Sequence, residues 1–158
     1  LNLSPVLKER FQRFQVVYHV RLINRYEHIL LGGFHIEEAV YGPLYYYPGR
    51  QPGHPPCYYE AEMPPDAILV LLTARPDVIE RRMRETPHEY PIVPKQDIQM
   101  VLDRFEKEYG ASWIKHKIRI DTSDLTPEQL LQKFLDASVY HINTRDLLTR
   151  MAGSVGLR

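Results

Sequence analysis

Residues 66–73 read DAILVLLT, a run that is apolar at every position from Ala67 to Leu72. Its length and the residues that bound it favour a strand over a helix. Strands of a parallel sheet that is covered on both faces are apolar throughout. We therefore expect this run to form a strand at the centre of such a sheet, buried on both sides.

After this run helices separate one strand from the next. That order is typical of an open, mainly parallel α/β sheet flanked by helices. The expected elements are a helix from Pro76 that Thr86-Pro87 breaks, a helix from about Lys95 that Gly110 closes, a strand at residues 117–121, a helix with the capping box Thr126-Gln129, and a last helix over residues 139–151.

The segment before the run predicts a long helix. Ser4 is a suitable N-cap and Pro5 a suitable first helical residue. An apolar stripe follows at steps of three and four: Leu7, Phe11, Phe14, Tyr18 and Leu22. From Val16 onward apolar residues lie on several faces, which indicates burial on more than one side. We then expect a short strand at residues 29–31, a turn at Gly32-Gly33, a short helix at residues 34–41, and a long ordered loop at residues 43–65.

Length and composition limit the possible functions. A chain of 158 residues has the size of one domain, and its 20 basic and 20 acidic residues balance. It therefore offers no global field for a nucleic acid polymer or a membrane. Cys57 has no disulfide partner, and no apolar run is long enough to span a bilayer, so we expect a cytoplasmic protein. Because the chain begins at Leu1 rather than Met, we expect a single domain over residues 1–158 that is incomplete at its N-terminal end.

Three arginines follow the central strand. Arg81, Arg82 and Arg84 stand on the helix that leaves its carboxyl end, where open α/β sheets bind their ligands. Guanidinium groups match phosphate oxygens bidentately and stabilise a transferring phosphoryl group. The alternative is a solvated basic face paired with Glu80 and Glu85.

Residues 67–72 and 75–84 resemble the strand and lid-entry helix of thymidylate kinases and deoxynucleoside kinases. In that family an acidic residue follows a proline and an arginine stands five positions later, as Asp77 and Arg82 do here. The helix that ends at Tyr109, residues 118–123 and the helix from Thr126 are similar to the family's closing strand and adenine-side loop. The resemblance covers residues 66–137.

The resemblance implies a P-loop kinase-like three-layer fold that uses ATP and Mg²⁺, with no protein metal ligand assigned. Arg82, with Arg81 and Arg84, would close over the donor phosphates as catalytic residues, and Thr122 and Ser123 would lie against the donor nucleotide. The family's phosphate-binding loop, GxxxxGK[ST], does not occur in this sequence. We expect it in a preceding segment, and its true loss is the alternative.

The acceptor side departs from the family. The resemblance places the family's Asp-Arg pair on Gly32-Gly33 and its following tyrosine on Tyr41, so both the acid and the cation are absent. This replacement puts phosphoryl transfer in question. Two glycines also fit a purely structural turn with positive φ. Glu37 or Glu38 lies near enough in sequence to supply a carboxylate.

The acceptor candidates lie on the first two helices. Phe34 and Tyr41 offer aromatic planes for a base, although both could equally be core residues. The polar face of the first helix carries Gln12, Gln15, His19 and Arg21. Gln15 resembles the base-reading glutamine of deoxynucleoside kinases by helix position. Arg25 resembles the thymidylate kinase arginine that reaches a monophosphate.

The sequence thus supports two main hypotheses. The first is a nucleoside or nucleoside monophosphate kinase whose partner is a small nucleotide or nucleoside. The second is a non-catalytic kinase-like module for nucleotide binding or protein interaction. A third, weaker one is a generic α/β interaction domain. Neither zinc spacing nor an activated serine or cysteine nucleophile is present. The long apolar first helix is a candidate homodimer face.

Overall fold

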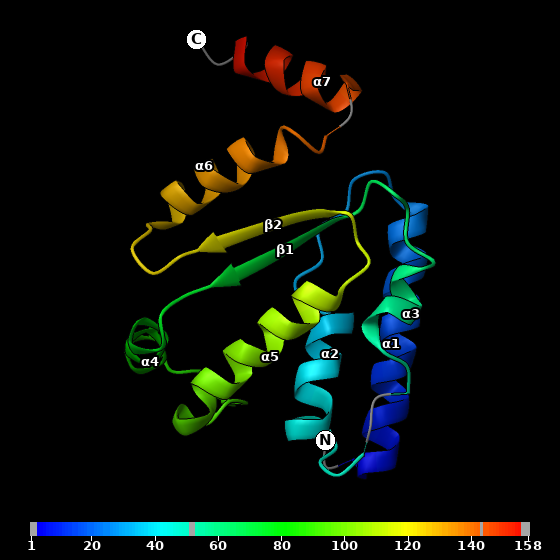
Figure 1. The fold of residues 1–158 in the computed structure, drawn as a ribbon, viewed down its shortest axis with the longest axis vertical. Coiled ribbons are helices and arrows are strands. Elements are labelled where there is room, and N and C mark those ends of the chain that lie inside the picture. Colours follow the sequence, from blue (N-terminus) through cyan, green and yellow to red (C-terminus); the bar gives the residue numbers. More distant parts are fainter. Residues whose placement is uncertain (1–2, 51–52, 143, 156–158) are drawn as a thin grey trace.

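A computed structural model of the protein describes residues 3–50, 53–142 and 144–155 (Figure 1). Its elements are α1 (Pro5–Arg25), α2 (His35–Tyr41), a π-helix (Gly42–Tyr46), α3 (Pro56–Glu60), β1 (Ile68–Thr73), α4 (Pro76–Glu85), a 3-10 turn (Lys95–Asp97), α5 (Ile98–Ala111), β2 (His116–Asp121), α6 (Pro127–Ser138) and α7 (Thr144–Val155). The protein is therefore α/β, as expected.

Strands β1 and β2 pair in parallel, with a register that runs from Ile68 opposite His116 to Thr73 opposite Asp121. In Figure 1 both arrows point the same way, with α5 on one side of the pair and α6 on the other. In the part of the chain that the structure describes, no third strand joins them.

The expectation that the central strand is buried on both faces is wrong. The side chains of β1 are mostly half-buried, and Leu72 is 53% exposed. The physical reason is that the faces of a strand are covered by the helices packed on them, and α5 packs against β1 while α6 packs mainly against β2. The better buried strand is β2, through Ile118 and Ile120.

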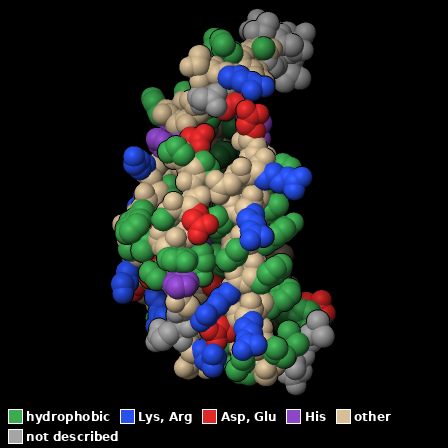
Figure 2. Space-filling view, turned by 90° about the vertical axis from the view of Figure 1, so that its right-hand side faces the viewer, with side chains coloured by type: hydrophobic (Ala, Val, Ile, Leu, Met, Phe, Trp, Pro, Cys, Tyr) green, Lys and Arg blue, Asp and Glu red, His purple; other side chains and the backbone are tan. Residues whose placement is uncertain are grey.

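Helix α1 packs on a different face from its predicted stripe. Its buried residues Val16 and Val20 form a core cluster with Tyr59 of α3, and Phe34 packs against that cluster. The predicted stripe is instead exposed at Leu7, Phe11, Phe14 and Tyr18. Because Val17 is also exposed, the expected burial of the second half on several sides is wrong. Figure 2 shows this flank of the molecule, where apolar side chains gather with Lys and Arg among them.

Local capping signals predicted the starts of helices well. The Ser4 side chain accepts the Leu7 N–H at the start of α1, and Thr126 and Gln129 form the predicted capping box of α6. The helix from Pro76 and the short helix before Tyr41 are confirmed as α4 and α2.

Several other boundaries differ from the predictions. Residues 29–31 form no strand, because no neighbouring strand pairs with them. Gly110 lies inside α5, which ends at Ala111 before an extended Ser112, so Gly110 is not the cap. The last helix begins at Thr144, since the chain turns after α6, where the His141 N–H reaches the Ser138 carbonyl. The long loop contains the π-helix and α3.

None of the helices in the described ranges has both the length and the apolar character that a bilayer span requires.

Candidate functional site

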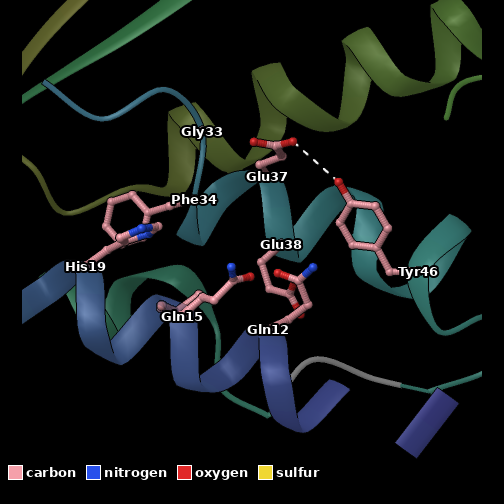
Figure 3. Close-up of a pocket in the computed structure, with 9 residues that line it drawn as sticks. Gln12, Gln15, His19, Gly33, Phe34, Glu37, Glu38 and Tyr46 are labelled. Atoms are coloured by element: carbon pink, nitrogen blue, oxygen red, sulfur yellow. Dashed lines mark hydrogen bonds between the residues drawn. The ribbon is translucent and has the colours of Figure 1, made fainter. Parts of the chain in front are cut away.

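A cavity of about 220 Å³ lies between α1 and α2 (Figure 3). Its lining residues are Gln12, Gln15, Val16, His19, Gly33, Phe34, Glu37, Glu38 and Tyr46. Helix α1 contributes the first four, at steps of three and four that place them on one face. The remaining residues come from the turn before α2, from α2 itself and from the π-helix.

Gly33 turns the chain into α2 and leaves room for a carboxyl group. Its φ is +60°, a backbone conformation that glycine adopts readily and that residues with a Cβ disfavour. A Cβ at this position would lie 1.6 Å from Oε2 of Glu37, whereas a Cβ on Gly32 would meet nothing within 4 Å. The Glu37 carboxyl therefore occupies the space that a side chain at residue 33 would need. Figure 3 shows Glu37 beside this turn.

Glu37 is held at the edge of the cavity by Tyr46. The Tyr46 hydroxyl donates to Glu37 Oε1 at 3.5 Å, the contact drawn in Figure 3. Burial raises the pKa of Glu37, and the tyrosine's hydrogen bond offsets only part of that effect. Because burial disfavours the ionised form, this carboxyl holds a proton to a higher pH than an exposed glutamate does.

Glu38 is buried, at 8% exposure, and only one of its oxygens is paired. Its Oε1 accepts a hydrogen bond from the hydroxyl of Tyr47, which is itself fully buried. Its Oε2 has no hydrogen-bond partner among the described residues. Burial raises the pKa of Glu38, against the opposing effects of the Tyr47 hydroxyl and of Arg13.

His19 supplies a second unpaired group. Its Nδ1 is buried without a partner in the described chain, and its ring stands edge-on to Phe34 with centroids 5.4 Å apart. Phe34 in turn lies against the His35 ring at 4.3 Å. Buried polar atoms in native proteins almost always have partners, so an unpaired one needs an explanation. Two such atoms, Glu38 Oε2 and His19 Nδ1, belong to residues that line this one cavity, which makes it the candidate site.

The structure brings most of the predicted acceptor candidates together. The candidates that line the cavity are Gln12, Gln15, His19, Phe34, Glu37 and Glu38, whereas Arg21 does not line it. Tyr41 does not, because its ring packs edge-on against Phe105 of α5 at 5.3 Å. Arg25 is exposed in the last turn of α1, where its guanidinium lies 5.8 Å from the centre of the Tyr26 ring.

A second cavity, of about 550 Å³, opens at the carboxyl ends of the strands. Its lining includes Thr73 of β1, Arg82 of α4, Thr122 after β2, and Thr126 at the start of α6, with leucines between them. Arg82 donates from Nη1 to Thr122 Oγ1 at 3.0 Å and from Nη2 to the Thr122 carbonyl at 2.7 Å. The Thr122 N–H donates to the Thr73 carbonyl at 2.8 Å, so this threonine joins both strands to α4.

The other predicted donor-side residues lie outside this lining. Arg81 and Arg84 are exposed on α4, and Arg81 lies 3.9 Å from Glu85. Ser123 is buried behind the strand ends, where its Oγ accepts the Arg75 N–H and donates to Asp121. These hydrogen bonds from Ser123 lower the pKa of Asp121. All three arginines are exposed, but Arg82 alone of the three lines the cavity and bonds to Thr122, so the solvated basic face describes Arg81 and Arg84.

Sequence reasoning missed two tyrosines of the first site. Tyr46 and Tyr47 hold Glu37 and Glu38 from nine residues further along the chain. The cluster of tyrosines after α2 signalled an ordered segment, but no periodicity links it to these carboxyls, since the π-helix sets the connection.

In the described ranges no group of three or more His, Cys, Asp and Glu side chains is placed to hold a metal ion. Mg²⁺ in phosphotransfer sites is held by one or two carboxylates and the substrate phosphates, so it needs no such cluster.

No protein-family model, curated protein or solved structure matches this chain.

Proposed function

We propose that this protein transfers the γ-phosphoryl group of ATP to a nucleoside or nucleoside monophosphate, in the manner of thymidylate kinases. The observation that supports this most is the cavity between α1 and α2, which combines an aromatic ring, two amides, the buried carboxyl of Glu38 and the half-buried carboxyl of Glu37. Such a mixture of one flat apolar surface and a few polar groups suits a purine or pyrimidine nucleoside.

The acceptor would bind in that cavity. The Phe34 ring would pack against the base, and the amides of Gln12 and Gln15 would pair with its polar edge, because an amide both donates and accepts. The unpaired Oε2 of Glu38 would accept a hydrogen bond from a ligand hydroxyl or amino group.

The donor would bind at the carboxyl ends of β1 and β2. Arg82 lines the cavity there, and its two hydrogen bonds to Thr122 use one hydrogen from each terminal nitrogen. A guanidinium has five N–H donors, so hydrogens remain for phosphate oxygens. Mg²⁺, when bound with ATP, supplies charge neutralisation at the donor phosphates. A phosphate-binding loop such as GxxxxGK[ST] is required in addition, and it would come from outside this sequence.

A coupled assay of the full-length protein with Mg-ATP and each nucleoside or monophosphate tests the proposal. Arg82→Ala is expected to lower kcat by about a hundredfold or more, because a charge-stabilising donor contributes on that scale. Lys133→Ala, an exposed cation on α6, is the matched control. If no acceptor stimulates ADP formation by the wild-type protein, the transferase proposal is wrong.

One observation favours a second candidate, a nucleotide-binding module without turnover. The Arg82 guanidinium already donates two hydrogen bonds to Thr122 at the end of β2, so Arg82 also has a structural role. The Gly32-Gly33 turn also carries neither acid nor cation. This candidate predicts calorimetric binding of nucleotides with no ADP formation.

A further inference from the structure

The lining of the cavity between α1 and α2 contains acidic side chains but neither lysine nor arginine. Two of its lining residues, Glu37 and Glu38, carry carboxyl groups, and the lining includes neither lysine nor arginine. Figure 3 shows these carboxyls with the amides of Gln12 and Gln15 and the paired rings of His19 and Phe34. A phosphate group placed here would lie beside two carboxyls, and the donors that the described lining offers are the two amides, the Tyr46 hydroxyl and the His19 ring, with no lysine or arginine among them.

The arginines on and near α1 lie outside the lining of the cavity. Arg13 and Arg50 both form ion pairs with the buried Glu9, outside the cavity lining. Arg13 does weaken the upward shift of the Glu38 pKa, but it is not part of the lining. Arg10, Arg21 and Arg25 are exposed on α1. Phosphate sites in proteins instead combine guanidinium, ammonium or several backbone N–H groups.

The unpaired atoms of the cavity define what a ligand must bring. An ionised carboxylate has no proton to donate, so the unpaired Oε2 of Glu38 then acts only as a hydrogen-bond acceptor. Its partner in a ligand has to be a donor such as a hydroxyl or an amine. Protonation of either carboxyl removes negative charge but still supplies no cation for a phosphate. The volume of about 220 Å³ is also small for a ligand pocket, which suits a ligand without a phosphate.

We propose that the acceptor is the unphosphorylated nucleoside, whose hydroxyl or amino group donates to Glu38, and that the cavity discriminates against the corresponding monophosphate. This inference rests on the proposed function, because it assumes that the cavity is the acceptor site. The discrimination follows from the placement of two carboxyls where a phosphate-binding site would need cations.

Calorimetry on the full-length protein with thymidine, deoxycytidine, deoxyadenosine, deoxyguanosine and their 5′-monophosphates tests this inference. The best nucleoside is expected to bind at least tenfold more tightly than its own monophosphate. Glu38→Gln is expected to weaken that nucleoside about tenfold, because one acceptor oxygen is replaced by a donor. Glu37→Gln is expected to narrow the gap between nucleoside and monophosphate, because it removes one negative charge.

Lys133→Ala is the control that should change neither affinity, and thermal melting of every variant checks that it is folded. Phe34→Ala reports whether the bound molecule occupies this cavity, since it should weaken any ligand that packs there. A monophosphate that binds as tightly as its nucleoside, and that Phe34→Ala weakens, overturns the inference and leaves the transferase proposal standing. If nucleosides bind as expected but no ADP forms, the transferase proposal is wrong and the nucleoside preference stands. Absence of binding by every nucleoside overturns the inference.

Discussion

His35 Nε2 lies 2.9 Å from Glu60 Oε1, and the two side chains are 4% and 0% exposed. The second Glu60 oxygen, Oε2, accepts the backbone N–H of Trp113 at 2.6 Å. One carboxylate therefore joins α2, α3 and the segment between α5 and β2. Burial alone would raise the pKa of Glu60, but its hydrogen bonds from His35, Trp113 and Ser112 outweigh burial and lower it.

Glu60→Ala is expected to destabilise the fold by about 3–5 kcal/mol, because it leaves a buried histidine and a backbone N–H without their partner. Chemical denaturation at neutral pH measures this loss. Glu62→Ala, two residues away and exposed, should change the free energy of unfolding by less than about 0.5 kcal/mol. Since the folded Glu60 pKa is lowered, its stabilisation is present above pH 4.5 and is lost as the pH falls through the folded value. A loss for Glu60→Ala as small as that of the control would show that the pair contributes little.

Gly33→Ala is expected to cost about 1–2 kcal/mol from its left-handed backbone alone, and more because the new Cβ displaces the Glu37 carboxyl. Gly32→Ala is a close control, since a Cβ there meets no atom within 4 Å. Thermal melting of both variants compares them. Equal melting temperatures would mean that the turn and the Glu37 contact do not constrain this segment.

Glu38→Gln is expected to flatten the dependence of stability on pH. The raised pKa of Glu38 means that the folded state binds its proton more tightly than the unfolded chain does. Wild-type stability should therefore fall as the pH rises from about 4.5, the ordinary value, through the folded pKa. Glu37 acts in the same direction, so part of the slope remains in the variant. Melting temperatures measured between pH 5 and pH 8 test this, and identical slopes for the two proteins would contradict it.

Arg82→Ala is expected to destabilise the protein by about 1–3 kcal/mol, because it removes two charge-assisted hydrogen bonds to Thr122. Arg81→Ala should cost less than about 0.5 kcal/mol, since Arg81 is exposed and its ion pair with Glu85 is a long one, at 3.9 Å. Urea unfolding separates the two. Equal losses would show that Arg82 has no special structural role.

Local signals in the sequence determined where several helices begin and which segments form the two strands. Ser4, Pro76 and Thr126 set the beginnings of α1, α4 and α6, because capping depends on residues that are near one another along the chain. Residues 68–73 form β1, as predicted from the apolar run, which is also a local signal. The acceptor candidates Gln12, Gln15, His19, Phe34 and Glu38 were also recognised before the structure placed them on one cavity.

Only the tertiary structure decided which faces are buried and which charges are engaged. The apolar stripe of α1 is exposed because Tyr59 packs on its other face, from a helix almost forty residues further along the chain. Residue type alone could not show that Glu38 retains an unpaired oxygen or that Arg82 holds Thr122, since both depend on contacts between distant segments. Sequence periodicity specifies a helix and its faces, whereas the partner that covers each face is chosen by packing of the whole chain.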